Sequence, residues 1–109
     1  MTVIEKKYVA TLVAFMCAVS QSPKGVKYFG DTCKELGVSS SDIQDCMSKG
    51  PAFKKTMYET LRLMSYYDKK LAQQYLLKAA LADGSDFSAL IMNEIFVECD
   101  MFDNDAPIL

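Results

Sequence analysis

Apolar residues recur at spacings of three and four along most of the chain, which is the period of an α-helix with one buried face. The clearest run of apolar side chains covers residues 3–20. Five further runs follow it, in residues 23–36, 43–47, 53–64, 71–79 and 87–102. Since no segment alternates between apolar and polar residues as a strand does, the pattern predicts an all-α protein, a compact bundle of about five to six helices.

Short polar segments between the runs contain residues that begin and end helices. Pro23 and Pro51 suit the first turn of a helix, because proline lacks the amide hydrogen that this turn leaves unbonded. Ser39 with Asp42 three residues later matches a capping box, in which each side chain accepts a hydrogen bond from the other residue's amide. Asp68 is the expected N-cap of the helix that carries residues 71–79.

The segment between the last two predicted helices has two interpretations. As a joint, Gly84 can adopt the left-handed conformation that ends a helix, and Ser85 can cap the next one. As an ion site, Asp83 and Asp86 would offer the oxygen ligands that calcium or magnesium prefers. The spacing does not match an EF-hand loop, because a phenylalanine occupies a position that needs a side-chain oxygen.

The formal net charge of −2 conceals an asymmetry between the two ends of the chain. Residues 1–70 contain 11 Lys and Arg against 7 Asp and Glu, whereas residues 71–109 contain one lysine against 7 acids. This asymmetry predicts a binding surface for a protein partner with a basic surface rather than for nucleic acid. The candidate residues are Glu94, Glu98, Asp100, Asp103 and Asp105. The alternative is that both halves mix in three dimensions, so that their charges average out.

The four cysteines, Cys17, Cys33, Cys46 and Cys99, lie singly on apolar runs, which predicts buried free thiols in a reducing compartment such as the cytoplasm. The chain contains no histidine, so it lacks the common zinc spacings and the usual base that activates a serine or cysteine nucleophile. With no glycine-rich phosphate loop either, the sequence predicts a protein without enzymatic activity and without a cofactor. The run in residues 3–20 is too short to span a bilayer, and we interpret it as a core helix.

Residues 8–37 and 71–100 share an outline, because each predicts a helix, a short break and a second helix that ends near a cysteine. Two related helical hairpins are therefore one interpretation of the fold. A length of 109 residues suits a single domain. We assign that domain to residues 1–102 and a short acidic C-terminal tail to residues 103–109.

The segments KELGVSSSDIQ and AALADG, placed after a long apolar helix, resemble the bacterial tellurite-resistance TerB-like domain over residues 3–102. The resemblance implies an all-helical, non-enzymatic domain linked to stress responses, membrane-associated complexes and divalent-cation binding. Ala82, Asp83 and Gly84 match the turn of that family, and Asp86 follows closely. The chain departs from the family at SQSPKG, where the family has a second acidic turn, and at the start of the last helix, where glutamates are usual.

Together these features predict a cytoplasmic binding or adaptor module of TerB-like type. The alternative is a small acidic inhibitor, such as an immunity protein or a phage-encoded counter-defence protein, which would block a basic surface of its target. Since the composition is rich in apolar residues, a homodimer is also a reasonable expectation.

Overall fold

The computed structural model describes residues 1–101, and within that range it contains six α-helices and no strand. The all-α prediction is therefore confirmed. The helices are α1 (Val3–Ala18), α2 (Pro23–Leu36), α3 (Ser40–Ser48), α4 (Ala52–Arg62), α5 (Tyr66–Asp83) and α6 (Asp86–Glu98). The predicted tail, with Asp103 and Asp105, lies outside the described residues, as does the last residue of the predicted domain.

Helix α1 forms the centre of the bundle and contacts each of the other five helices. Nine of its residues are buried, including Leu12, Val13 and Met16. A helix that is apolar on all sides is expected to be surrounded by protein, and α1 meets this expectation.

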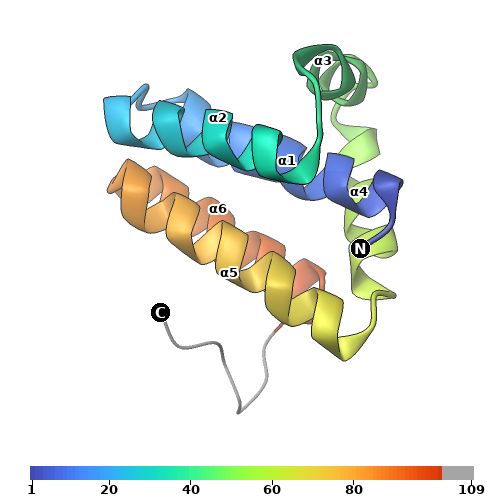
Figure 1. Cartoon of the computed structure of the whole chain (residues 1–109). Coiled ribbons are helices and arrows are strands. Elements are labelled where there is room, and N and C mark those ends of the chain that lie inside the picture. The colour runs from blue at the N-terminus through green and yellow to red at the C-terminus, as the bar shows by residue number, and fades with distance from the viewer. Residues whose placement is uncertain (102–109) are drawn as a thin grey trace.

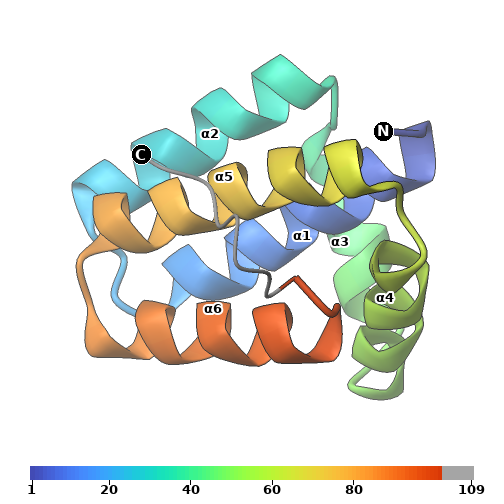
Figure 2. The ribbon, with the colours of Figure 1, turned by 90° about the horizontal axis from the view of Figure 1, so that it is seen from below.

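Two helical hairpins, α1–α2 and α5–α6, pack against each other (Figure 1), while α3 and α4 close one end of the bundle. Seen from below in Figure 2, α5 lies in front of α1, with α2 and α6 on either side. The turns that join the helices of each hairpin lie together at the end opposite α3 and α4.

The predicted capping residues mostly occupy the predicted positions. Ser39 and Asp42 form the capping box at the start of α3, and Ser85 caps α6 by accepting a hydrogen bond from the amide of Ser88. Gly84 ends α5 in the left-handed conformation, with φ of 74°. The interpretation of residues 83–86 as a helix joint is confirmed.

The predicted N-cap at Asp68 is wrong. Ser65 caps α5, because its hydroxyl accepts a hydrogen bond from the amide of Asp68 in the first turn. The carboxylate of Asp68 instead accepts a hydrogen bond from the N-terminal amine of Met1, at 3.1 Å. Asp68 in the first turn still complements the dipole of α5, while Ser65 caps the helix.

Helix α6 ends earlier than predicted. Its last helical residue is Glu98, and Asp100 turns the chain with φ of 53°. The amide of Met101 then bonds to the carbonyl of Phe96, and the side-chain amide of Gln73 donates to the carbonyl of Met101. These bonds hold the chain beyond α6 against the core, where Met101 is buried.

Candidate functional site

Helix α6 is rich in apolar residues, as α1 is, yet it lies at the surface of the bundle. It packs against α1, α4 and α5 with one face only. On the opposite face the side chain of Leu90 is 68 % exposed and that of Val97 is 59 % exposed, with Phe87 one turn before Leu90. We call these three residues the α6 ridge. An apolar helix with an uncovered face is expected to have a partner.

Carboxylates border the α6 ridge. Every fourth position along α6 forms one row, which contains Asp86, Leu90, Glu94 and Glu98. This spacing places all four side chains on the same side of the helix. All three acids are exposed. The prediction that Glu94 and Glu98 share one face therefore agrees with the helix that the structure contains.

Glu94 also connects α6 to α4. Its Oε2 atom lies 3.2 Å from Lys54 Nζ and accepts a hydrogen bond from the Tyr58 hydroxyl at 3.1 Å. Burial and then the carboxylate of Glu94 raise the pKa of Tyr58. A lysine from the basic half of the chain thus balances one charge of the acidic half.

The remaining acidic candidates are Asp100, Asp103 and Asp105. Asp100 is exposed just after α6, and its backbone carbonyl accepts a hydrogen bond from Lys69 at 3.3 Å. Asp103 and Asp105 lie outside the described residues. Part of the charge asymmetry is therefore reduced by the packing of α6 against α4 and by Lys69 from α5.

Asp83 lies at the joint between α5 and α6 and connects the two hairpins. Its carboxylate accepts hydrogen bonds from the hydroxyls of Ser20 and Ser85 and from the amide of Ser85. Burial opposes the charged form, but the hydrogen bonds from Ser20 and Ser85 outweigh it and lower the pKa of Asp83. Only 7 % of Asp83 is exposed. The bonds attach the end of α1 to the start of α6.

The structure places the two proposed ion ligands differently. Asp83 points into the joint, where both of its oxygens accept hydrogen bonds from serines, whereas Asp86 is exposed as the first residue of α6. Across residues 1–101, no group of three or more His, Cys, Asp or Glu side chains is arranged to hold a metal ion. The calcium or magnesium site stays a prediction from the sequence.

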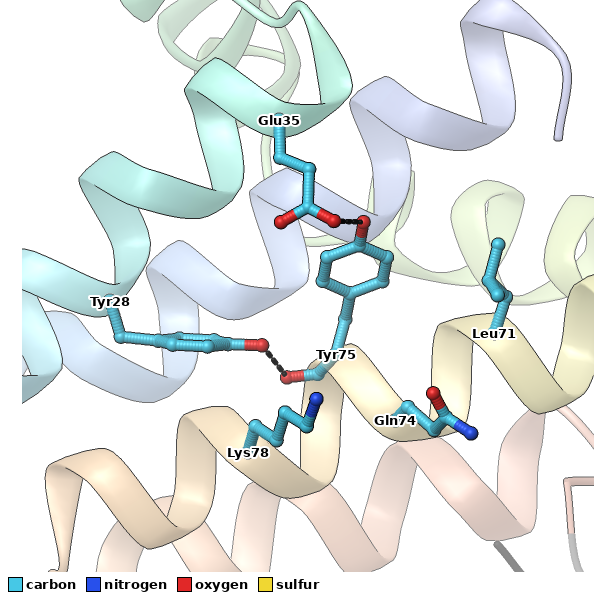
Figure 3. Close-up of a pocket in the computed structure, with 6 residues that line it drawn as sticks. All are labelled: Tyr28, Glu35, Leu71, Gln74, Tyr75 and Lys78. Carbon is cyan, nitrogen blue, oxygen red and sulfur yellow. Dashed lines mark hydrogen bonds between the residues drawn. The ribbon is translucent and has the colours of Figure 1, made fainter. Parts of the chain in front are cut away.

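A polar pocket of about 170 Å³ lies between α2 and α5 (Figure 3). The hydroxyl of Tyr28 donates to the backbone carbonyl of Tyr75 at 2.9 Å, and the hydroxyl of Tyr75 donates to Glu35 at 2.7 Å. Burial and then Glu35 raise the pKa of Tyr75. The two tyrosines thus attach α2 to α5, while Gln74 and Lys78 line the same pocket.

An apolar groove of about 480 Å³ lies between α1, α2 and α3. Its lining includes Cys17, Val26, Phe29, Ile43 and Met47. A second compartment of about 280 Å³ shares Met47 and extends past Pro51 to Lys54 on α4. We call the two compartments together the groove. The sequence does not show the groove, because it depends on how α1, α2, α3 and α4 pack against one another.

All four cysteines are free thiols. Cys99 is fully buried, and burial raises its pKa to about 12. Burial and then Asp83 raise the pKa of Cys17 to about 11. Cys33 is only half-buried. The prediction of buried free thiols is confirmed for Cys17, Cys46 and Cys99, whereas Cys33 is unpaired but only half-buried.

In the native protein at pH 8, a thiol reagent should therefore modify Cys33 first and Cys99 slowest. The thiolate of Cys99 is expected to be roughly a thousandfold scarcer than that of a free cysteine, and burial also blocks access. The measurement is the rate of colour release from a disulfide reagent, with peptide mapping of the modified sites. Cys33→Ser should remove the fast phase. A fast phase at Cys99 would contradict the buried position of this thiol.

Comparisons with protein families, with curated proteins and with solved structures find no match to this chain. The TerB-like resemblance stays a prediction from the sequence. No helix in the described part of the chain is long and apolar enough to cross a membrane. The structure thus defines an all-α bundle with an uncovered apolar and acidic helix face.

The sequence predicted Glu94 and Glu98 as binding residues but assigned Asp86 to an ion site, and it did not predict the α6 ridge. Leu90 lies in the same apolar run, residues 87–102, as the buried Ile95, so the run alone does not show which of the two is exposed. A signal was present, since α6 has too many apolar residues for a helix with one buried side.

Proposed function

We propose that the protein is a non-enzymatic binding or adaptor module that holds a partner protein against the outer face of α6. The observation that carries this proposal is the exposure of Leu90 and Val97 on a helix whose other side already packs against the bundle. Two exposed apolar residues two turns apart can anchor in a partner pocket, while the surrounding polar residues exclude water.

The acids beside the α6 ridge indicate the chemistry of the partner. Asp86, Glu94 and Glu98 would face basic residues placed around an apolar centre. This is the surface that a small acidic inhibitor would use to block a basic site, and this narrower function is our second candidate. The free thiols fit a cytoplasmic setting, which is part of the proposal.

Replacing both Leu90 and Val97 by glutamine should reduce recovery of the partner about tenfold, because both anchors are lost. The measurement is affinity purification of the tagged protein from the cells that produce it. Since both side chains are exposed, the variant should fold with nearly unchanged stability. Leu63→Gln is the matched control, because Leu63 is 86 % exposed just after α4 and is not part of the α6 ridge.

The acidic contribution is tested separately with Glu94→Gln and Glu98→Gln. If the partner surface is basic, this pair should slow association and make it less sensitive to salt. Equal recovery of the same proteins with wild type and with the Leu90 and Val97 variant would contradict the proposed function. If the Leu90 and Val97 variant loses a partner whose binding does not depend on salt, the binding module is supported and the acidic inhibitor is rejected.

A further inference from the structure

The groove and the α6 ridge are two separate apolar surfaces of the same molecule. The larger compartment of the groove, about 480 Å³, is more than three times the size of a cavity of about 150 Å³ that accepts benzene. It therefore has room for several aliphatic side chains. Val26 and Met47 at the groove are themselves exposed, so this surface is open to another molecule.

The two surfaces differ in charge, because the groove is nearly uncharged and the α6 face is acidic. In the part of the chain that the structure describes, Lys54 is the one charged residue that lines the groove. Helix α6 contains no lysine or arginine, and its outer side carries Asp86, Glu94 and Glu98. Opposed α6 faces from two copies would bring like charges together, which is unfavourable. An α6 face opposite a groove instead brings acids to a lysine and apolar residues to apolar residues.

We propose that the α6 face of one copy docks in the groove of a second copy of this chain. In this contact Leu90 and Val97 enter the groove beside Val26 and Met47, and the acids of α6 approach Lys54. Lys54 already contacts Glu94 of its own chain, so it can join the acids of two copies in one charged network. The inference rests on the proposed function, because it names a partner for the same α6 face.

The contact joins two different patches, so it is heterologous. Such a contact produces a closed ring or a longer assembly, unless the geometry lets two copies exchange their α6 faces. Each contact needs an intact α6 face on one copy and an intact groove on the other. This requirement makes the proposal testable with two complementary variants.

The test is sedimentation velocity of the purified full chain over a series of concentrations at low salt. The wild-type weight-average mass should rise with concentration, and higher salt should reduce this rise. Leu90→Gln with Val97→Gln removes the docking face, and Val26→Glu with Met47→Glu places acids in the groove. Each variant alone should associate about tenfold more weakly than wild type. Leu63→Gln should associate as wild type does.

An equimolar mixture of the two variants is the decisive sample. One variant retains the groove and the other retains the α6 face, so the mixture should form a mixed dimer that neither variant forms alone. Circular dichroism of each variant checks that it is folded. A monomeric wild type at every concentration, or folded variants that do not associate when mixed, would overturn the inference.

Failure of the proposed self-association can be distinguished from failure of the proposed function. If the wild type stays monomeric but the Leu90 and Val97 variant still loses its cellular partner, self-association is rejected and the binding module stands. If the wild type self-associates through α6 and no other protein depends on this face, the second copy is the partner.

Discussion

Replacing Gly25 by alanine should lower the free energy of unfolding by about 1–3 kcal/mol, because the added methyl group has no room. A Cβ atom on Gly25 would lie 2.9 Å from Asp83 Oδ1, 3.2 Å from Asp83 Cα and 3.3 Å from Asp83 Cβ. Asp83 cannot simply rotate away, since two of these atoms belong to the backbone or are attached to it. Its carboxylate is also held by Ser20 and Ser85.

Gly30→Ala is the matched control for this substitution. Gly30 lies in the same helix α2, and a Cβ atom there would meet nothing within 4 Å. Alanine at this position should raise stability by about 0.5–1 kcal/mol, because glycine disfavours the helical conformation. Urea unfolding followed by circular dichroism measures both variants. Equal stabilities of the two alanine variants would contradict the close approach of α2 to Asp83.

Gly25 illustrates which parts of the fold the sequence reveals. In the sequence it resembles a helix breaker, yet it is buried inside α2 and makes room for Asp83. The chain turns instead at Gln21, which takes a left-handed φ of 51° without being glycine. The period of apolar residues revealed the helices because it is a local property. The need for glycine at position 25 arises from Asp83 at the end of α5, which is distant in the sequence. The residues around Gly25 therefore could not predict it.

The same distinction applies to the candidate site. The four-residue spacing of Glu94 and Glu98 on one face follows from the helix alone. The hydrogen bond from Tyr58 to Glu94 spans 36 residues and depends on how α4 packs against α6. The exposure of Leu90 depends on which side of α6 the bundle covers. Local patterns thus identified Glu94 and Glu98, and only the packing revealed the α6 ridge beside them.

Replacing Asp83 by asparagine should lower the free energy of unfolding by about 1.5–3 kcal/mol at pH 7, the range for hydrogen bonds to a charged group. The carboxylate accepts from two serine hydroxyls and one amide, whereas an asparagine side chain has a single acceptor oxygen. At least one donor at the joint between the hairpins would lose its partner. Asp86→Asn is the control, because Asp86 is exposed and should contribute only its interaction with the dipole of α6.

The pH dependence gives a second readout for Asp83. Since the pKa of Asp83 is lowered in the folded protein, the charged carboxylate stabilises the fold at pH values above the ordinary value of 3.8. This stabilisation is lost as the pH falls from the ordinary value through the lower pKa of the folded state. The stability difference between wild type and Asp83→Asn should therefore shrink below about pH 4, while it stays constant between about pH 5 and pH 7. A difference that stays constant down to pH 2 would show that the charge of Asp83 does not hold the hairpins together.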